Sequence, residues 1–147
     1  MNEAPILIGY DGSDDARRAV DFAAVLFPDR RAIVLDVGPV ITPAESLAAL
    51  TPGPYAFEDY NGSQAASTAA EGVRYARGAG LEADARAEVL APTWQGIVDV
   101  ADEIDAAVIV MGTRGLNGAR ELFEGSLSHE VAQHAGRPVL FVPPPHR

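Results

Sequence analysis

Four short, largely apolar runs divide the chain, at residues 5–9, 32–37, 106–111 and 138–142. Runs of this length are typical of strands that are buried on both faces of a parallel sheet. A further segment, residues 81–89, alternates apolar and polar positions, which predicts a strand nearer the edge of the sheet. The pattern therefore predicts five strands.

Between the strands, apolar residues recur at the spacing of one helix face. Ser13 is a suitable amino-terminal cap for the first helix, because Asp14 and Asp15 follow it in the first turn. Alternating strands and helices predict an α/β fold with right-handed crossovers and a doubly wound, parallel, five-stranded sheet. The expected helices cover residues 14–27, 65–78, 92–104 and 127–135.

Residues 38–62 show no clear period and are rich in proline. A loop of that length in a small domain is usually a lid or a disordered segment. There is no internal repeat and no linker, so residues 1–147 are expected to form one domain.

A glycine motif follows the fourth predicted strand: Gly112, two residues, Gly115, nine residues, then Gly125 and Ser126. Glycines let a phosphate approach the backbone closely, and the amino terminus of the next helix offers free N–H groups to an anion. Ser128 adds a hydroxyl and Arg114 adds positive charge. In doubly wound sheets ligands bind beyond the carboxyl ends of the strands, at the point where the strand order reverses. This motif is therefore a candidate polyphosphate site.

The junction after the first strand, residues 9–16, also contains glycine, but Asp14 and Asp15 occupy its helix start and would repel phosphate. We therefore assign the phosphates to Ser126. Asp11 could accept hydrogen bonds from a ribose or help to hold Mg²⁺, and we favour the ribose.

The motif, together with Asp11 after the first strand and the final run PVLFV, resembles the ATP-binding branch of the universal stress protein family over essentially the whole chain. The resemblance implies a three-layer, Rossmann-like sheet of order 3-2-1-4-5. It also implies an ATP ligand, with Mg²⁺, and a homodimer formed by pairing of the final strands.

Position by position, the resemblance places Asp11 at the ribose or adenine side and Val37 and Met111 against the adenine. The expected nucleotide-binding residues are Gly9, Asp11, Val37, Met111, Gly112, Arg114, Gly115, Gly125, Ser126, Leu127 and Ser128. Two positions depart from the family pattern: Thr113 stands where serine is frequent, and Asp36 where histidine is common. The second departure affects the predicted adenine pocket.

The net charge of −10 argues against nucleic acid or an anionic membrane as a partner. Cysteine is absent, which excludes disulfides and thiol catalysis. The first residues lack the features of a signal peptide, so a cytoplasmic location is expected.

Other chemistries find little support in the sequence. Neither a Walker-type motif nor G-x-G-x-x-G is present, and Ser126 does not lie in G-x-S-x-G. His129 and His134 are five residues apart and do not form an i, i+4 metal pair, and Trp94 is expected in the core.

Three functions are compatible with these patterns. The first is an ATP-binding regulator of a stress response, which recruits an unidentified protein partner and whose nucleotide state changes the lid or the dimer surface. The second is a slow ATPase or phosphotransferase that uses the same site, although the chain has no lysine and shows no clear catalytic base. The third is an interaction module that binds no nucleotide. The intact glycine motif favours the first.

Overall fold

The computed structural model describes residues 3–38, 55–89, 92–113 and 127–145. Its five strands form one sheet in which every neighbouring pair is parallel, in the order β3-β2-β1-β4-β5. The predicted fold class and strand order are therefore confirmed. The strands are β1 (Ile6–Gly9), β2 (Ala32–Gly38), β3 (Ala83–Val89), β4 (Val108–Gly112) and β5 (Val139–Val142).

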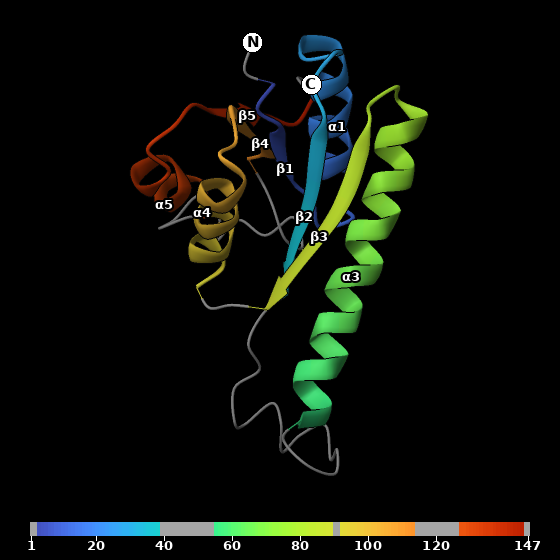
Figure 1. Cartoon of the computed structure of the whole chain (residues 1–147), viewed down its shortest axis with the longest axis vertical. Helices are drawn as coiled ribbons and strands as arrows, with labels where there is room; N and C mark the ends of the chain where they lie inside the picture. The colour runs from blue at the N-terminus through green and yellow to red at the C-terminus, as the bar shows by residue number, and fades with distance from the viewer. Residues whose placement is uncertain (1–2, 39–54, 90–91, 114–126, 146–147) are drawn as a thin grey trace.

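The helices cover both faces of the sheet, with α1 and α3 on one side and α4 and α5 on the other (Figure 1). Alternate strand residues pack against the two layers of helices: Ile6 and Ile8 pack on the α1 side, whereas Leu7 packs on the α4 side. Because these side chains are fully buried, each stabilises the fold by roughly 1.5–3 kcal/mol. The helices are α1 (Asp14–Leu26), α3 (Tyr55–Gly78), α4 (Thr93–Ile104) and α5 (Leu127–His134).

The strand predicted to lie nearer the edge does so, since β3 is the last strand on its side of the sheet. Only its first residue, Ala83, is buried, and the rest are exposed or half-buried. β1 and β4 are neighbours at the centre, where the chain reverses its direction of winding. The reversal point thus lies between the two strands that precede the glycine-bearing loops.

Helix α1 begins as its sequence predicts. The hydroxyl oxygen of Ser13 accepts a hydrogen bond from the backbone N–H of Ala16 at 3.1 Å, and Asp14 and Asp15 stand in the first turn. A cap of this kind satisfies one of the N–H groups that a helix start leaves unpaired.

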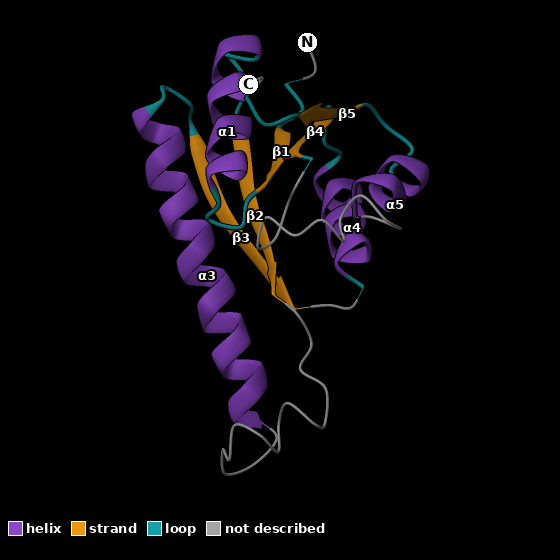
Figure 2. Ribbon diagram, turned by 180° about the vertical axis from the view of Figure 1, so that it is seen from behind, coloured by secondary structure: helices purple, strands orange, loops and turns teal. Residues whose placement is uncertain are grey.

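The start of α3 corrects the prediction that residues 38–62 are irregular, because the helix begins at Tyr55. Asn61-Gly62 is a turn signal in sequence, but one glycine inside a helix costs only about 1 kcal/mol and does not have to end it. Figure 2 shows that the first turns of α3 extend past the end of the sheet, where no apolar face is needed. The remainder of the predicted lid, residues 39–54, lies outside the described residues.

A search of the described helices for a membrane span found none that is both long and apolar enough.

Candidate nucleotide site at the carboxyl ends of β1, β2 and β4

The carboxyl ends of three strands surround a hollow of roughly 430 Å³, including the part that is open to solvent. The register brings β1 and β4 together, with Ile8 opposite Val110. At the next position Gly9 leaves room beside Met111, whose Cβ lies 3.5 Å from where a Cβ on Gly9 would stand. The lining residues are Gly9, Tyr10, Asp11, Ser13, Ala16, Leu35, Asp36, Val37, Thr93, Ile97, Met111, Gly112 and Leu127.

Six of the residues predicted to bind nucleotide line this hollow. Asp11 follows β1, Val37 is on β2, and Leu127 opens α5. Ser128 is not in the lining; its hydroxyl donates a 3.4 Å hydrogen bond to the backbone oxygen of Thr113. The six lining residues are Gly9, Asp11, Val37, Met111, Gly112 and Leu127.

The rest of the predicted phosphate site lies outside the described residues. Arg114, Gly115, Gly125 and Ser126 all fall within residues 114–126. Their roles stay predictions.

Only one oxygen of the Asp11 carboxylate is hydrogen-bonded within the described part of the protein. Its Oδ1 accepts a hydrogen bond from the backbone N–H of Ser13 at 2.9 Å, in the turn that leads into α1. Its Oδ2 is buried and has no hydrogen-bond partner within the described part of the chain. Because a buried carboxylate oxygen without a partner is costly, Asp11 is an acceptor ready for a donor such as a ribose hydroxyl.

Gly112 allows β4 and α1 to approach each other closely. A Cβ at this position would lie 3.1 Å from the backbone oxygen of Asp15 and 3.2 Å from its Cβ. The hydroxyl of the next residue, Thr113, is buried and also lacks a partner among the residues that the structure describes. The glycine motif thus begins where the backbones of β4 and α1 approach closely, next to a buried hydroxyl that has no partner among the described residues.

Tyr10, a lining residue of the hollow, is hydrogen-bonded to Glu71, which also binds Arg17; we call these three residues the Tyr10 network. The Tyr10 hydroxyl donates to Glu71 Oε2 at 2.6 Å, and Arg17 Nη2 donates to Glu71 Oε1 at 2.6 Å. Burial, with the Glu71 hydrogen bond, raises the pKa of Tyr10 to about 12, while the same contacts lower the pKa of Glu71. The network connects the residue that follows β1 with α1 and α3, and these hydrogen bonds fix the start of the loop after β1.

Sequence reasoning missed several residues of the hollow. Thr93 and Ile97 lie one turn apart on α4, and their position over the site depends on how α4 packs. Asp36 has a signal in sequence, as a carboxylate inside an apolar run, but the resemblance to the family gives it no binding role. Burial and the nearby charge of Asp11 raise the pKa of Asp36 to about 7.

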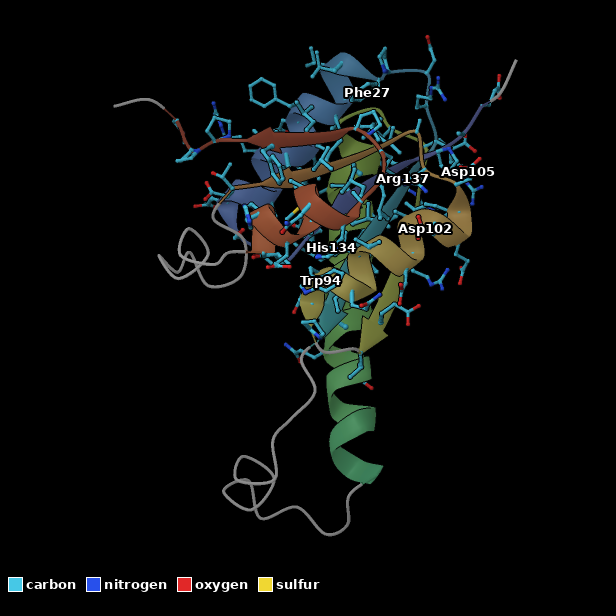
Figure 3. All side chains as sticks on the ribbon, turned by 90° about the vertical axis from the view of Figure 1, so that its left-hand side faces the viewer. Phe27, Trp94, Asp102, Asp105, His134 and Arg137 are labelled. Carbon is cyan, nitrogen blue, oxygen red and sulfur yellow. The ribbon has the colours of Figure 1, made fainter. Side chains whose placement is uncertain are left out.

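Trp94 links the two helices on this side of the sheet. Its ring stacks on that of His134 in α5, with the ring centroids 4.2 Å apart (Figure 3). His134 is exposed, and its Nε2 lies 3.3 Å from Glu130 Oε2. Trp94 is only partly buried and packs against the core on the α4 side rather than inside it.

Comparison with known proteins agrees with this arrangement. The model of the universal stress protein family matches residues 4–143. The chain belongs to the universal stress protein family. Universal stress protein YxiE of Bacillus subtilis is 29% identical over 143 residues, which cover 93% of this chain and 97% of that protein.

Two solved structures of universal stress proteins hold adenine nucleotides. One, in complex with cAMP, is 26% identical, with a TM-score of 0.67, and the match covers 94% of this chain and 95% of the other. The protein from Archaeoglobus fulgidus in complex with dAMP is 28% identical, with a TM-score of 0.62 and coverage of 93% and 95%.

Proposed function

We propose that this universal stress protein binds an adenine nucleotide, ATP with Mg²⁺, in the hollow at the carboxyl ends of β1, β2 and β4, and that it acts as a nucleotide-dependent regulator in a stress response. The observation that carries the proposal is the Oδ2 of Asp11 inside that hollow, which is buried and has no hydrogen-bond partner in the part of the chain that the structure describes. The two relatives with cAMP and dAMP support an adenine nucleotide as the ligand class.

In this proposal each part of the ligand meets a suitable part of the site. Asp11 accepts hydrogen bonds from the ribose, and the apolar side chains of Val37 and Met111 contact the adenine. The phosphates extend toward the start of α5, near Leu127 and Ser128, where helix N–H groups and the positive end of the helix dipole favour anions. The glycine motif supplies the remaining contacts through Arg114, Gly115, Gly125 and Ser126.

The test begins with the purified protein itself. Any small molecule released by denaturation is identified by mass spectrometry, and the stripped protein is titrated with ATP and MgCl₂ by calorimetry. We expect an adenine nucleotide in the extract, or saturable heat and a raised unfolding temperature on titration. Absence of both would refute the proposal.

A substitution at Gly112 tests whether the nucleotide binds in this hollow. Gly112→Val should abolish the titration heat, because the added side chain meets Asp15 where β4 crosses α1. Gly136→Val is the matched control, since a Cβ at Gly136 would meet nothing within 4 Å. Although Gly136 has a φ of +61°, so that its replacement costs stability, nucleotide binding should survive.

We also propose a homodimer through β5 and a regulatory protein partner that the nucleotide state controls. β5 is an edge strand, and Val139, Leu140 and Phe141 are only half-buried. Figure 3 shows the strand on the side facing the viewer, with no further strand in front of it. An uncovered edge favours pairing with a second strand. Sedimentation should show a dimer, and substituting Phe141→Lys should give monomers.

A further inference from the structure

Asp36 is a second carboxylate in the hollow. It lies in β2 on the same side as Val34, which packs under α1 and α3, whereas its neighbours Leu35 and Val37 face α4. It is partly buried and lines the hollow. Together with Asp11 it gives the ribose side of the proposed site two acidic groups.

The other charged groups on this face of the sheet do not compensate the charge of Asp36. Asp11, at the end of β1, is a like charge that disfavours ionisation of Asp36. Asp15 stands in the first turn of α1 and is also acidic. The guanidinium of Arg17, the cation of the Tyr10 network, is held by Glu71 at 2.6 Å.

Among the described residues, Asp11 is the charged group close enough to shift the pKa of Asp36, whereas Arg74 of α3 acts on Glu71. The register partner of Asp36 on β3 is Ala87. Arg86, next to it, belongs to the opposite face and is paired with Glu88 at 2.8 Å and with Glu103. α4 contributes only Thr93 and Ile97 to the lining.

We propose that Asp36 is a nucleotide-binding residue that acts as a neutral carboxylic acid, so that the protein takes up a proton when it binds its nucleotide. The inference rests on the proposed function, because it concerns the same ligand. It adds that the affinity of this site for nucleotide depends on pH near neutrality.

The direction of the coupling follows from charge and solvation. A nucleotide in the hollow displaces water from Asp36 and adds its negative charge to a site that already holds two carboxylates, and both effects disfavour the ionised form of Asp36. The ribose hydroxyls have an acceptor in Oδ2 of Asp11, which none of the described residues occupies, so a second carboxylate is not required there. A protonated Asp36 can instead donate a hydrogen bond to a ligand oxygen.

Since half of Asp36 is protonated near pH 7 before binding, nucleotide affinity should fall as pH rises. If only the protonated form binds, linkage gives about a tenfold weaker Kd at pH 8 than at pH 6. About half a proton should be taken up per nucleotide near pH 7.

The experiment uses cAMP, whose phosphodiester carries one charge throughout this pH range, and full-length protein. Binding is measured by calorimetry at three pH values for wild type, Asp36→Asn and the exposed control Asp29→Asn. At pH 7 the measurement is repeated in two buffers of different ionisation enthalpy, which counts the protons taken up. We expect a pH-dependent Kd and proton uptake for wild type and for Asp29→Asn, and a flat profile for Asp36→Asn.

Each outcome decides a different point. If wild type binds cAMP with no proton uptake, or if Asp36→Asn retains the wild-type pH profile, Asp36 is not coupled to binding and the inference is overturned while the proposed function stands. If affinity of the wild type rises with pH relative to Asp36→Asn, Asp36 acts as a charged acceptor and the inference is equally overturned. If wild type binds neither cAMP nor ATP at any pH, the proposed function fails, and the inference with it.

Discussion

The two ends of the sheet differ in how far their polar side chains are hydrogen-bonded within the protein. At the amino ends of β4 and β5, Arg137 donates to the backbone oxygen of Ala106 at 2.6 Å and to Asp102 Oδ1 at 2.8 Å, with Asp105 3.7 Å away (Figure 3). At the carboxyl ends of β1 and β4, Asp11 Oδ2 and the Thr113 hydroxyl are buried without a partner among the described residues.

The contrast separates polar groups that are paired within the protein from groups that have no partner among the described residues. Nε of Arg137 also lacks a partner, but the two terminal nitrogens of its guanidinium are both bonded within the protein. Native proteins pair nearly all buried polar groups, so a pocket whose lining includes a buried carboxylate oxygen with no partner among the described residues is a candidate binding site. Substitutions at the two ends should therefore affect different measurements.

The largest effect is expected at the amino end. Arg137→Ala leaves the buried Ala106 oxygen unpaired and should lower the free energy of unfolding by about 1–3 kcal/mol, measured by urea denaturation. Arg31→Ala is the control, because its ion pair with Asp84 is half exposed and contributes at most about 1 kcal/mol. A loss of nucleotide affinity without a loss of stability in Arg137→Ala would break the comparison.

At the carboxyl end, stability should depend on pH through Asp36. Its pKa of about 7 in the folded protein is above that of an unfolded aspartate, near 3.9, so its contribution to stability is full below about pH 4 and is lost as pH rises through 7. Asp36→Asn should therefore be more stable than wild type at pH 8.5, on the order of 2 kcal/mol, with the difference shrinking toward pH 4. Urea denaturation at both pH values tests this; a constant difference would contradict it.

Asp11→Asn separates the two uses of that carboxylate. The amide oxygen can still accept from Ser13, but the amide nitrogen cannot accept from a ribose hydroxyl. We expect nucleotide affinity to fall roughly tenfold, as is usual when a hydrogen bond to a charged group is lost, with unfolding free energy unchanged or higher. Equal affinity in calorimetry would remove Asp11 from the site.

Ser13 lines the hollow but also has a structural role, as the cap of α1. Ser13→Ala removes the cap of α1 and should lower the free energy of unfolding by about 1 kcal/mol. Ser67→Ala, at an exposed position of α3, is the matched control and should change little. Equal stability of the two variants in urea denaturation would show that the cap contributes nothing.

The smallest effect is expected at the stack between α4 and α5. His134→Ala should cost about 0.5 kcal/mol and change the emission of Trp94, which is the only tryptophan of the chain. Gln133→Ala, an exposed neighbour on α5, should leave the emission unaltered. Unchanged fluorescence in His134→Ala would mean that the stack does not persist in solution.

Much of this fold was predictable because its elements obey local rules. The strands are apolar runs, β3 shows the alternation of an edge strand, and Ser13 followed by two acidic residues begins α1. The start of α3 was mispredicted, since Asn61-Gly62 resembles a turn and the helix there extends past the sheet.

The features of the candidate site can likewise be divided into those that the sequence predicts and those that depend on tertiary packing. The sequence alone determined the glycine motif, the position of Asp11 after the first strand, and the placement of both at the reversal of the strand order. Only the tertiary structure decided that Thr93 and Ile97 line the hollow, that one oxygen of Asp11 has no partner among the described residues, and that Asp36 shares the hollow with it. These properties depend on packing between distant segments, and a carboxylate's burial and nearby charges have no periodic signal in sequence.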